Sequence, residues 1–167
     1  MDALIEMLEN AIAADIGADT VLMDFWFSAP KNVKRITALK ALKLHVITIL
    51  KVRSAKYTTY DGKTVTTKGI LDEIKASNTD KSIARELYVQ LGGGLQGKLI
   101  FAKNWSKDGS DKRRPCISLL TTHTCWSGQE ICDGYELRWN IEVFYNQLKN
   151  GFYLQSGNQT RLFESNL

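Results

Sequence analysis

Residues 129–149, QEICDGYELRWNIEVFYNQLK, decide the interpretation of this chain because one helical pattern there carries two distinct faces. At about 100° per residue, four polar side chains fall within roughly 60° of one another: Tyr135, Arg138, Glu142 and Lys149. The opposite side is apolar and consists of Leu137, Ile141, Phe144 and Leu148. A lone carboxylate flanked by cations and a phenol suits a metal-dependent enzyme that acts on nucleic acid. The alternative is a surface helix with a solvated face, on which Arg138 and Glu142 form only an i,i+4 ion pair.

The composition is that of an ordinary globular protein with a mild basic excess. The chain has 167 residues, of which 44% are hydrophobic and 24% charged, and its formal net charge is +4. This length allows one domain, or one domain with a substantial insertion, and the charge permits a polyanionic partner without requiring one. The three cysteines form no CxxC pair, which favours reduced thiols in a cytoplasmic protein over a zinc site. The acidic start is not a signal peptide, and no run of about 18 apolar residues predicts a membrane span.

Helices and strands are predicted to alternate in the first third of the chain. The predicted elements are a helix over 3–15, a strand over 20–23, a helix over roughly 31–42 and a strand over 44–52. Pro30 suits the first turn of the second helix. Asp24 directly follows the first strand and precedes a turn, which places its carboxylate at the carboxyl edge of a sheet. Folds of the α/β class commonly keep their chemistry at that edge.

The middle of the chain is richer in strand signals. The predicted elements are a hairpin over 57–68 that turns at Asp61-Gly62, a short helix over 69–75, an interruption at Gly92–Gly94, and strands over 97–105 and 115–121. A polar turn over 106–114 joins the last two strands and ends in three cations, Lys112, Arg113 and Arg114. Such runs usually face water. Ser127 and Glu130 then form a Ser-x-x-Glu capping box, which opens the last long helix.

This order of elements predicts an α/β protein with a mixed sheet, interrupted by a β-rich insertion of about 75 residues. The expected divisions are a first part of the core over 1–52, the insertion over 53–126, the Glu-bearing helix of the core over 127–155 and a frayed tail over 156–167. The insertion is expected to form its own largely antiparallel strands.

The pattern Tyr135-x-x-Arg138-x-x-x-Glu142-x-x-x-x-x-x-Lys149 resembles the Tyr-Arg-Glu-Lys signature of bacterial insertion-sequence transposases of the insertion-sequence-four type. The stretch VLMDFWFSAPK around Asp24 is similar to that family's strand bearing its second catalytic aspartate. The resemblance covers most of the chain. It implies DNA transposition by a ribonuclease-H-like domain, of which this chain would hold a partial core. In that family an Asp, Asp, Glu triad binds two Mg²⁺ or Mn²⁺ ions, which promote phosphodiester cleavage and strand transfer.

The resemblance also implies roles for individual residues. The catalytic metal ligands would be Asp24 and Glu142. The groups that bind double-stranded DNA at the transposon ends would be Tyr135, Arg138 and Lys149, with Lys112, Arg113 and Arg114 as further candidates. Trp105 and Trp126 are candidates to stack on a base, and the alternative for both is a core or interface tryptophan. A second transposase subunit is a further expected partner, and the expected location is the bacterial cytoplasm at the nucleoid.

The chain departs from the family pattern before Asp24. Only 23 residues precede it, too few for the three strands and the helix that carry the first aspartate and lead to the second. We therefore expect a truncated catalytic fragment that neither cleaves nor joins DNA alone. One alternative is a non-catalytic basic α/β module that binds nucleic acid or protein. Another is an unrelated metal-dependent nuclease that uses carboxylates in the same way.

Overall fold

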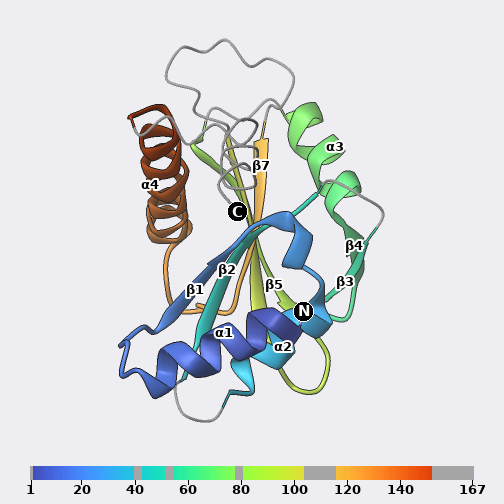
Figure 1. Cartoon of the computed structure of the whole chain (residues 1–167). Helices are drawn as coiled ribbons and strands as arrows, with labels where there is room; N and C mark the ends of the chain where they lie inside the picture. Colours follow the sequence, from blue (N-terminus) through green and yellow to red (C-terminus); the bar gives the residue numbers. More distant parts are fainter. Residues whose placement is uncertain (1, 40–42, 52–54, 78–80, 104–115, 152–167) are drawn as a thin grey trace, which may run out of the picture. The chain divides into compact units, whose positions relative to one another are not determined.

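The computed structural model describes residues 2–39, 43–51, 55–77, 81–103 and 116–151 (Figure 1). In that part the chain is an α/β protein with one seven-stranded mixed sheet and four α-helices. The helices are α1 (Asp2–Ala13), α2 (Pro30–Thr37), α3 (Thr67–Ser77) and α4 (Gly128–Gly151), with a 3-10 helix, η1 (Phe25–Phe27). The strands are β1 (Thr20–Met23), β2 (His45–Ile49), β3 (Lys56–Thr59), β4 (Thr64–Thr66), β5 (Ile83–Gln90), β6 (Gln96–Lys103) and β7 (Cys116–Thr121). Residues up to Tyr135 form one compact unit and those from Glu136 a second, and each is described by itself.

The strands lie in the order β1-β2-β7-β6-β5-β3-β4. Strands β1 and β2 are parallel, and Met23 pairs with Thr48, so the carboxyl ends of both strands lie at the same edge of the sheet. All other pairings are antiparallel. The strands predicted for the insertion pair antiparallel with one another, as expected. They do not form a sheet of their own, because β7 pairs directly with β2 and all seven strands belong to one sheet.

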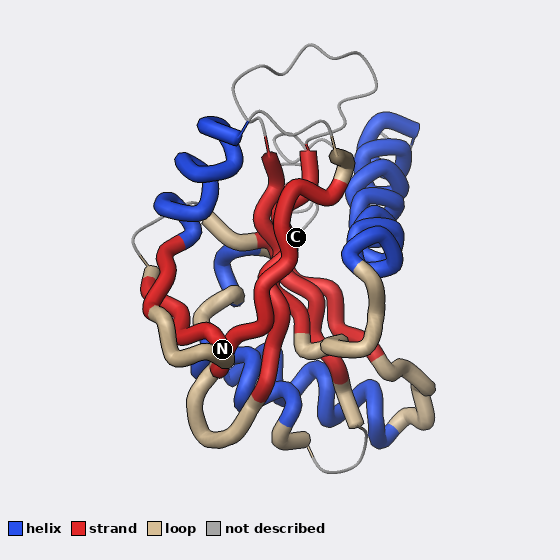
Figure 2. The backbone as a smooth tube through the Cα atoms, turned by 180° about the vertical axis from the view of Figure 1, so that it is seen from behind, coloured by secondary structure: helices blue, strands red, loops and turns tan. Residues whose placement is uncertain are grey.

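Side chains alternate between the two faces of the sheet, as the pleat of a strand requires. Val46, Leu99 and Leu120 belong to a core on one face, to which α1, α2 and α3 contribute. Figures 1 and 2, from opposite sides, show α1 and α2 on that same face. The next residues along β2 and β6, Ile47 and Ile100, lie in a second core with the first turns of α4. Helices therefore cover both faces, which explains why the central strands carry buried apolar residues on both faces.

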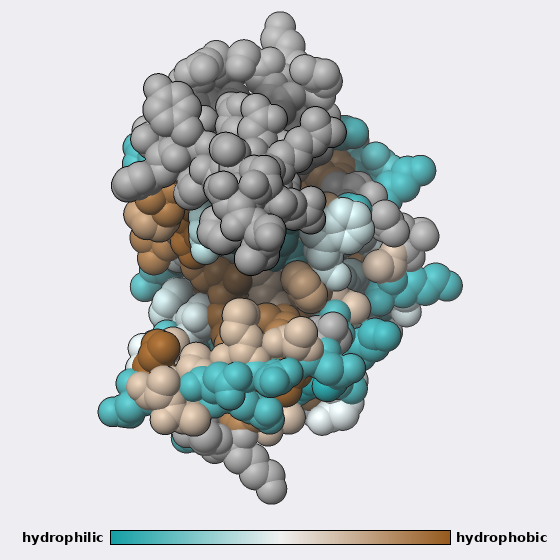
Figure 3. Space-filling model, in the orientation of Figure 1, coloured by the Kyte–Doolittle hydropathy of each residue, from teal (hydrophilic) through white to brown (hydrophobic). Residues whose placement is uncertain are grey.

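Helix α1 is amphipathic, as its sequence predicts. Its inward side packs against the first core through Leu4, Ile5, Leu8 and Ile12. Glu6 and Glu9 are exposed, and Figure 3 shows hydrophilic side chains along the lower front of the molecule, where α1 lies in Figure 1. Asp2 accepts a hydrogen bond from Arg35 of α2 at 2.7 Å, which lowers the pKa of the Asp2 carboxyl.

Most predicted elements of the described residues are confirmed, with shifts of a few residues at their ends. Helix α2 ends at Thr37, earlier than predicted, and the N–H of Leu39 bonds the carbonyl of Ile36 at 3.1 Å, a tightening typical of a last turn. Strand β5 was not predicted. Its exposed and buried residues alternate only in its second half, where half-buried Leu87 and buried Val89 are separated by an exposed residue.

Three successive glycines make the tight connection between β5 and β6, as the predicted interruption required. Gly92, Gly93 and Gly94 all have positive φ angles, of 81°, 61° and 76°, a region in which residues with a Cβ are strained. The N–H of Leu91 bonds the carbonyl of Leu95 at 2.8 Å and closes the turn.

Candidate functional site

The carboxylate of Asp24 is held by the local turn that follows β1. Asp24 has extended backbone angles and caps η1, and its carboxylate accepts the N–H of Phe25 at 2.6 Å. Its carbonyl accepts the hydroxyl of Thr48, from β2, at 3.3 Å. The side chain is only half buried. Because an ionised carboxylate has about four acceptor sites, most of its acceptor capacity remains for a ligand.

Beside Asp24 lies a group that we call the Trp26 cluster: Phe25, Trp26 and Lys51. Lys51 follows β2, and its Nζ lies 3.8 Å from the centre of the Phe25 ring and 4.3 Å from that of Trp26. The two rings are 4.6 Å apart at 37°. The parallel pairing of β1 with β2 explains this meeting, because it carries residues that follow both strands to one edge of the sheet. Neither Trp26 nor Lys51 was among the residues predicted from the sequence, although VLMDFWF places two aromatic residues directly after Asp24.

Tyr135 connects α4 with the end of β1. Its side chain is buried in the second core, and its hydroxyl donates to the carbonyl of Met23 at 3.3 Å. The resemblance implies that this phenol binds DNA phosphate, whereas the structure places it in the protein interior. Its position nevertheless brings the first turns of α4 next to the residue that precedes Asp24.

Arg138 and Glu142 lie on α4 within the second unit. They form an i,i+4 ion pair with a direct hydrogen bond from the guanidinium to the carboxylate. The side chain of Glu142 is 43% exposed, so the pair contributes little to stability by itself. This is the ion pair expected if the polar stripe is a solvated face of a surface helix.

The remaining predicted site residues are distributed as follows. Trp126 stacks on the ring of His123, with centres 3.9 Å apart and an angle of 13° between the planes. Its indole therefore already has an aromatic partner inside the protein. Trp105, Lys112, Arg113 and Arg114 lie outside the described residues, and so does the side chain of Lys149.

Two histidines from distant parts of the sequence meet near the amino ends of β1 and β2. His123 stacks on His45 with ring centres 3.9 Å apart, and its Nε2 lies 2.8 Å from the hydroxyl of Thr20. Burial lowers the pKa of His123, and His45 lowers it further, against the opposing charge of Asp19. His45 and His123 are far apart in the sequence, so no local pattern indicated this contact.

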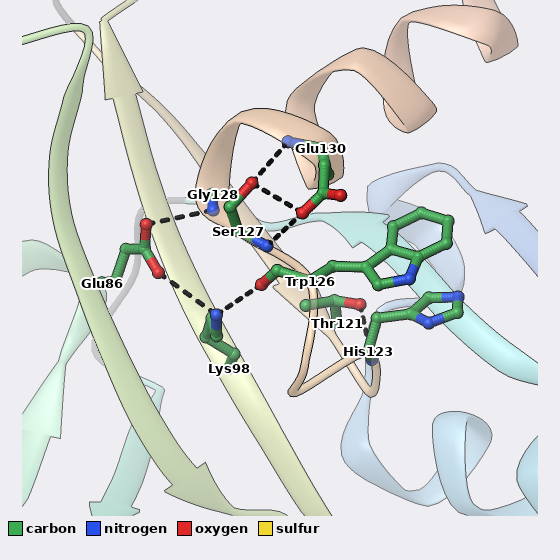
Figure 4. A network of polar contacts seen from close by, with 8 residues as sticks. All are labelled: Glu86, Lys98, Thr121, His123, Trp126, Ser127, Gly128 and Glu130. Carbon is green, nitrogen blue, oxygen red and sulfur yellow. Dashed lines mark hydrogen bonds and ion pairs between the residues drawn. The ribbon is translucent and has the colours of Figure 1, made fainter.

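A polar network fixes the start of α4 (Figure 4). Lys98 of β6 is buried, and its ammonium donates to the Glu86 carboxylate at 3.2 Å and to the Trp126 carbonyl at 2.6 Å. The other oxygen of Glu86 accepts the N–H of Gly128 at 3.0 Å, which places a negative charge at the amino end of the helix. The predicted capping box is confirmed: Ser127 accepts the N–H of Glu130 at 3.2 Å and donates its own N–H to the Glu130 carboxylate at 2.7 Å.

Among the described residues, no three His, Cys, Asp or Glu side chains are gathered closely enough to hold a metal ion. None of the helices in that part of the chain is both long and apolar enough to cross a membrane. No protein-family model, curated protein or solved structure matches this sequence. The functional interpretation therefore depends on the chain's own residues.

Proposed function

We propose that this chain is a DNA-binding catalytic domain of a DDE transposase, with a partial ribonuclease-H-like core. The observation that carries the proposal is the surroundings of Asp24. A half-exposed carboxylate follows a parallel strand at the carboxyl edge of the sheet, and Tyr135, in the first turns of α4, donates to the carbonyl of Met23, the residue before Asp24. This arrangement supports the role that the sequence pattern predicts for Asp24, and the role of Glu142 is carried by the sequence pattern itself.

The metal expected for such a domain is Mg²⁺ or Mn²⁺, which would activate the attacking oxygen and stabilise the leaving oxygen of a phosphodiester. Asp24 and Glu142 supply the carboxylate oxygens that these ions prefer. Among the described residues no three His, Cys, Asp or Glu side chains form a group that could hold a metal ion, so those residues alone do not fit a complete two-metal site. We therefore expect no cleavage or joining of DNA by this chain alone, and the third carboxylate must come from another segment or a second subunit.

The cations of α4 would bind the DNA backbone. Arg138 presents a planar guanidinium that matches phosphate oxygens, and Lys149 follows three turns later on the same helical stripe. Binding of transposon ends should then be salt-sensitive, because each phosphate contact releases counterion.

The proposal is tested by Mn²⁺ binding, followed by electron paramagnetic resonance, on the folded chain. Asp24→Asn and Glu142→Gln should each weaken Mn²⁺ binding by at least about tenfold, since each removes a ligand charge from the same site. Asp72→Asn on α3 and Glu136→Gln on α4 are matched controls that should bind as the unaltered chain does. Unchanged Mn²⁺ binding by both Asp24→Asn and Glu142→Gln would refute the shared metal site.

A second candidate function is a non-catalytic basic α/β module that binds nucleic acid. The Arg138–Glu142 ion pair and the absence of a three-ligand group among the described residues favour it. This candidate predicts duplex DNA binding that is the same with Mn²⁺ and with a chelator. The transposase proposal instead predicts tighter binding with Mn²⁺, and that increase should be absent in Glu142→Gln.

A further inference from the structure

We propose that the Trp26 cluster binds an unpaired nucleotide of a DNA strand that passes Asp24, with Trp26 stacking on the base and Lys51 contacting a neighbouring phosphate. This inference deepens the proposed function and rests on it for the choice of DNA as the ligand. It differs from the sequence-based candidates, because Trp126 is already stacked within the protein and Trp105 lies outside the described residues.

The indole of Trp26 is open to a ligand. The residue is 72% exposed, the highest value among the large hydrophobic residues in the described part of the chain. Phe25 and Lys51 lie against the ring, yet most of its surface remains in contact with solvent. A flat aromatic surface of this kind can accept any base, since every base has a π face.

The backbone that presents Trp26 is fixed on both sides. Before it, the carboxylate of Asp24 caps η1. After it, the hydroxyl of Ser28 donates to the carbonyl of Phe25 at 2.7 Å, and the amide of Asn32 donates to the carbonyl of Phe27 at 3.2 Å. The exposed indole therefore projects from a turn whose main chain is already ordered, which reduces the entropy lost on binding.

The charge of the cluster favours a nucleotide over an apolar protein surface. A cation at 4.3 Å from the indole centre supplies a phosphate contact within reach of a stacked base. Paired bases inside a duplex cannot reach the indole, so the ligand is a single-stranded end or an unpaired base. The nearest carboxylate along the chain is Asp24, the residue that would act on the adjoining phosphodiester.

The test compares two DNA probes by fluorescence anisotropy, at about 50 mM salt and with a chelator present so that no metal contributes. One probe is a blunt duplex of about 20 base pairs, and the other is the same duplex with a single-stranded 3′ overhang. Trp26→Ala should weaken binding of the overhang probe by at least about fivefold and leave the blunt duplex unchanged, whereas Trp26→Phe should retain most of the affinity. Lys51→Gln should also weaken overhang binding, with a shallower salt dependence.

Trp139→Ala is the matched control, because Trp139 is a second exposed tryptophan, on α4, and its loss should not change overhang binding. The melting temperature of Trp26→Ala should equal that of the unaltered chain, since the removed ring is largely in solvent. Equal binding of the overhang probe by Trp26→Ala and the unaltered chain would overturn the proposal, and so would equal weakening of both probes. A Trp26-dependent binding of anionic lipid vesicles in place of DNA would also overturn it.

The two proposals fail separately. Loss of the Mn²⁺ site without loss of the Trp26 effect would leave a single-strand binding cluster on a non-catalytic module. Loss of the Trp26 effect with an intact Mn²⁺ site would leave the transposase proposal standing and refute the nucleotide site alone.

Discussion

The Glu86–Lys98 pair gives the sharpest prediction about stability. The side chain of Lys98 is 3% exposed, whereas that of Glu86 is 36% exposed, so the two partners differ in their access to water. Glu86→Gln would leave a buried ammonium with neutral acceptors only. Breaking a buried ion pair in this way costs about 3 kcal/mol, at the lower end of the usual range because Glu86 is partly solvated.

Lys98→Met should reduce the free energy of unfolding by less than Glu86→Gln does, although it removes the same ion pair. The Glu86 carboxylate can then turn towards water and keep its bond to the Gly128 N–H, and methionine fills most of the space of the lysine stem. The remaining loss is the donor to the Trp126 carbonyl, which costs about 1 kcal/mol. The double variant should match Lys98→Met, because no buried charge remains, so the effects of the two substitutions should be strongly non-additive.

The assay is urea unfolding followed by far-ultraviolet circular dichroism. Glu73→Gln is the control, because Glu73 pairs with Arg85 at 3.5 Å while both side chains are at least half exposed, and its loss should cost less than about 1 kcal/mol. Equal and small losses for Glu86→Gln and Lys98→Met would show that the ammonium is hydrated and that the reasoning from burial is wrong.

Three further predictions concern single residues. The lowered pKa of His123, caused first by burial, means that the unfolded chain binds this proton more tightly. Its contribution to stability should be complete above the unfolded pKa of about 6.5 and be lost as the pH falls below it, and His123→Gln should flatten the dependence of melting temperature on pH. Gly97→Ala should cost about 1–3 kcal/mol in urea unfolding, because the new Cβ would lie 2.9 Å from the Leu91 side chain and 3.1 Å from a strand carbonyl oxygen. Ser127→Ala removes the side-chain cap of α4 and should lower the free energy of unfolding by about 1 kcal/mol in the same assay, whereas Ser127→Thr should lower it much less.

Local patterns predicted the elements of this fold well, because each pattern follows from a local cause. The capping box at Ser127 and Glu130, the turn at Asp61-Gly62 and the three glycines after Leu91 all act within a few residues, and the structure confirms each of them. The strand that precedes Asp24 was predicted for the same reason. Strand β5 was missed because only half of it alternates clearly between exposed and apolar residues.

Contacts between distant segments could not be read from the sequence. No local sequence pattern predicts that Lys51 lies over Trp26, because that contact depends on the parallel pairing of β1 with β2. The burial of Tyr135 was likewise hidden, since a tyrosine at the margin of a polar helical stripe suits a core position as well as a phosphate site. The side chain that the pattern assigned to DNA is instead bonded to the carbonyl of Met23.

The order of strands in the sheet has a consequence for how the protein folds. Strands β5, β6 and β7 are neighbours in both sequence and space, so their pairing closes short loops. Strand β2 instead reaches β7 by joining Ile47 to Thr121, which lie far apart in the sequence. Short loops lose less entropy on closing, so the β5–β7 meander should form early and β1 with β2 should add late. Amide protons of β6 should then exchange most slowly with solvent, and those of the edge strand β1 faster. The strand that presents Asp24 would be assembled last and opened first.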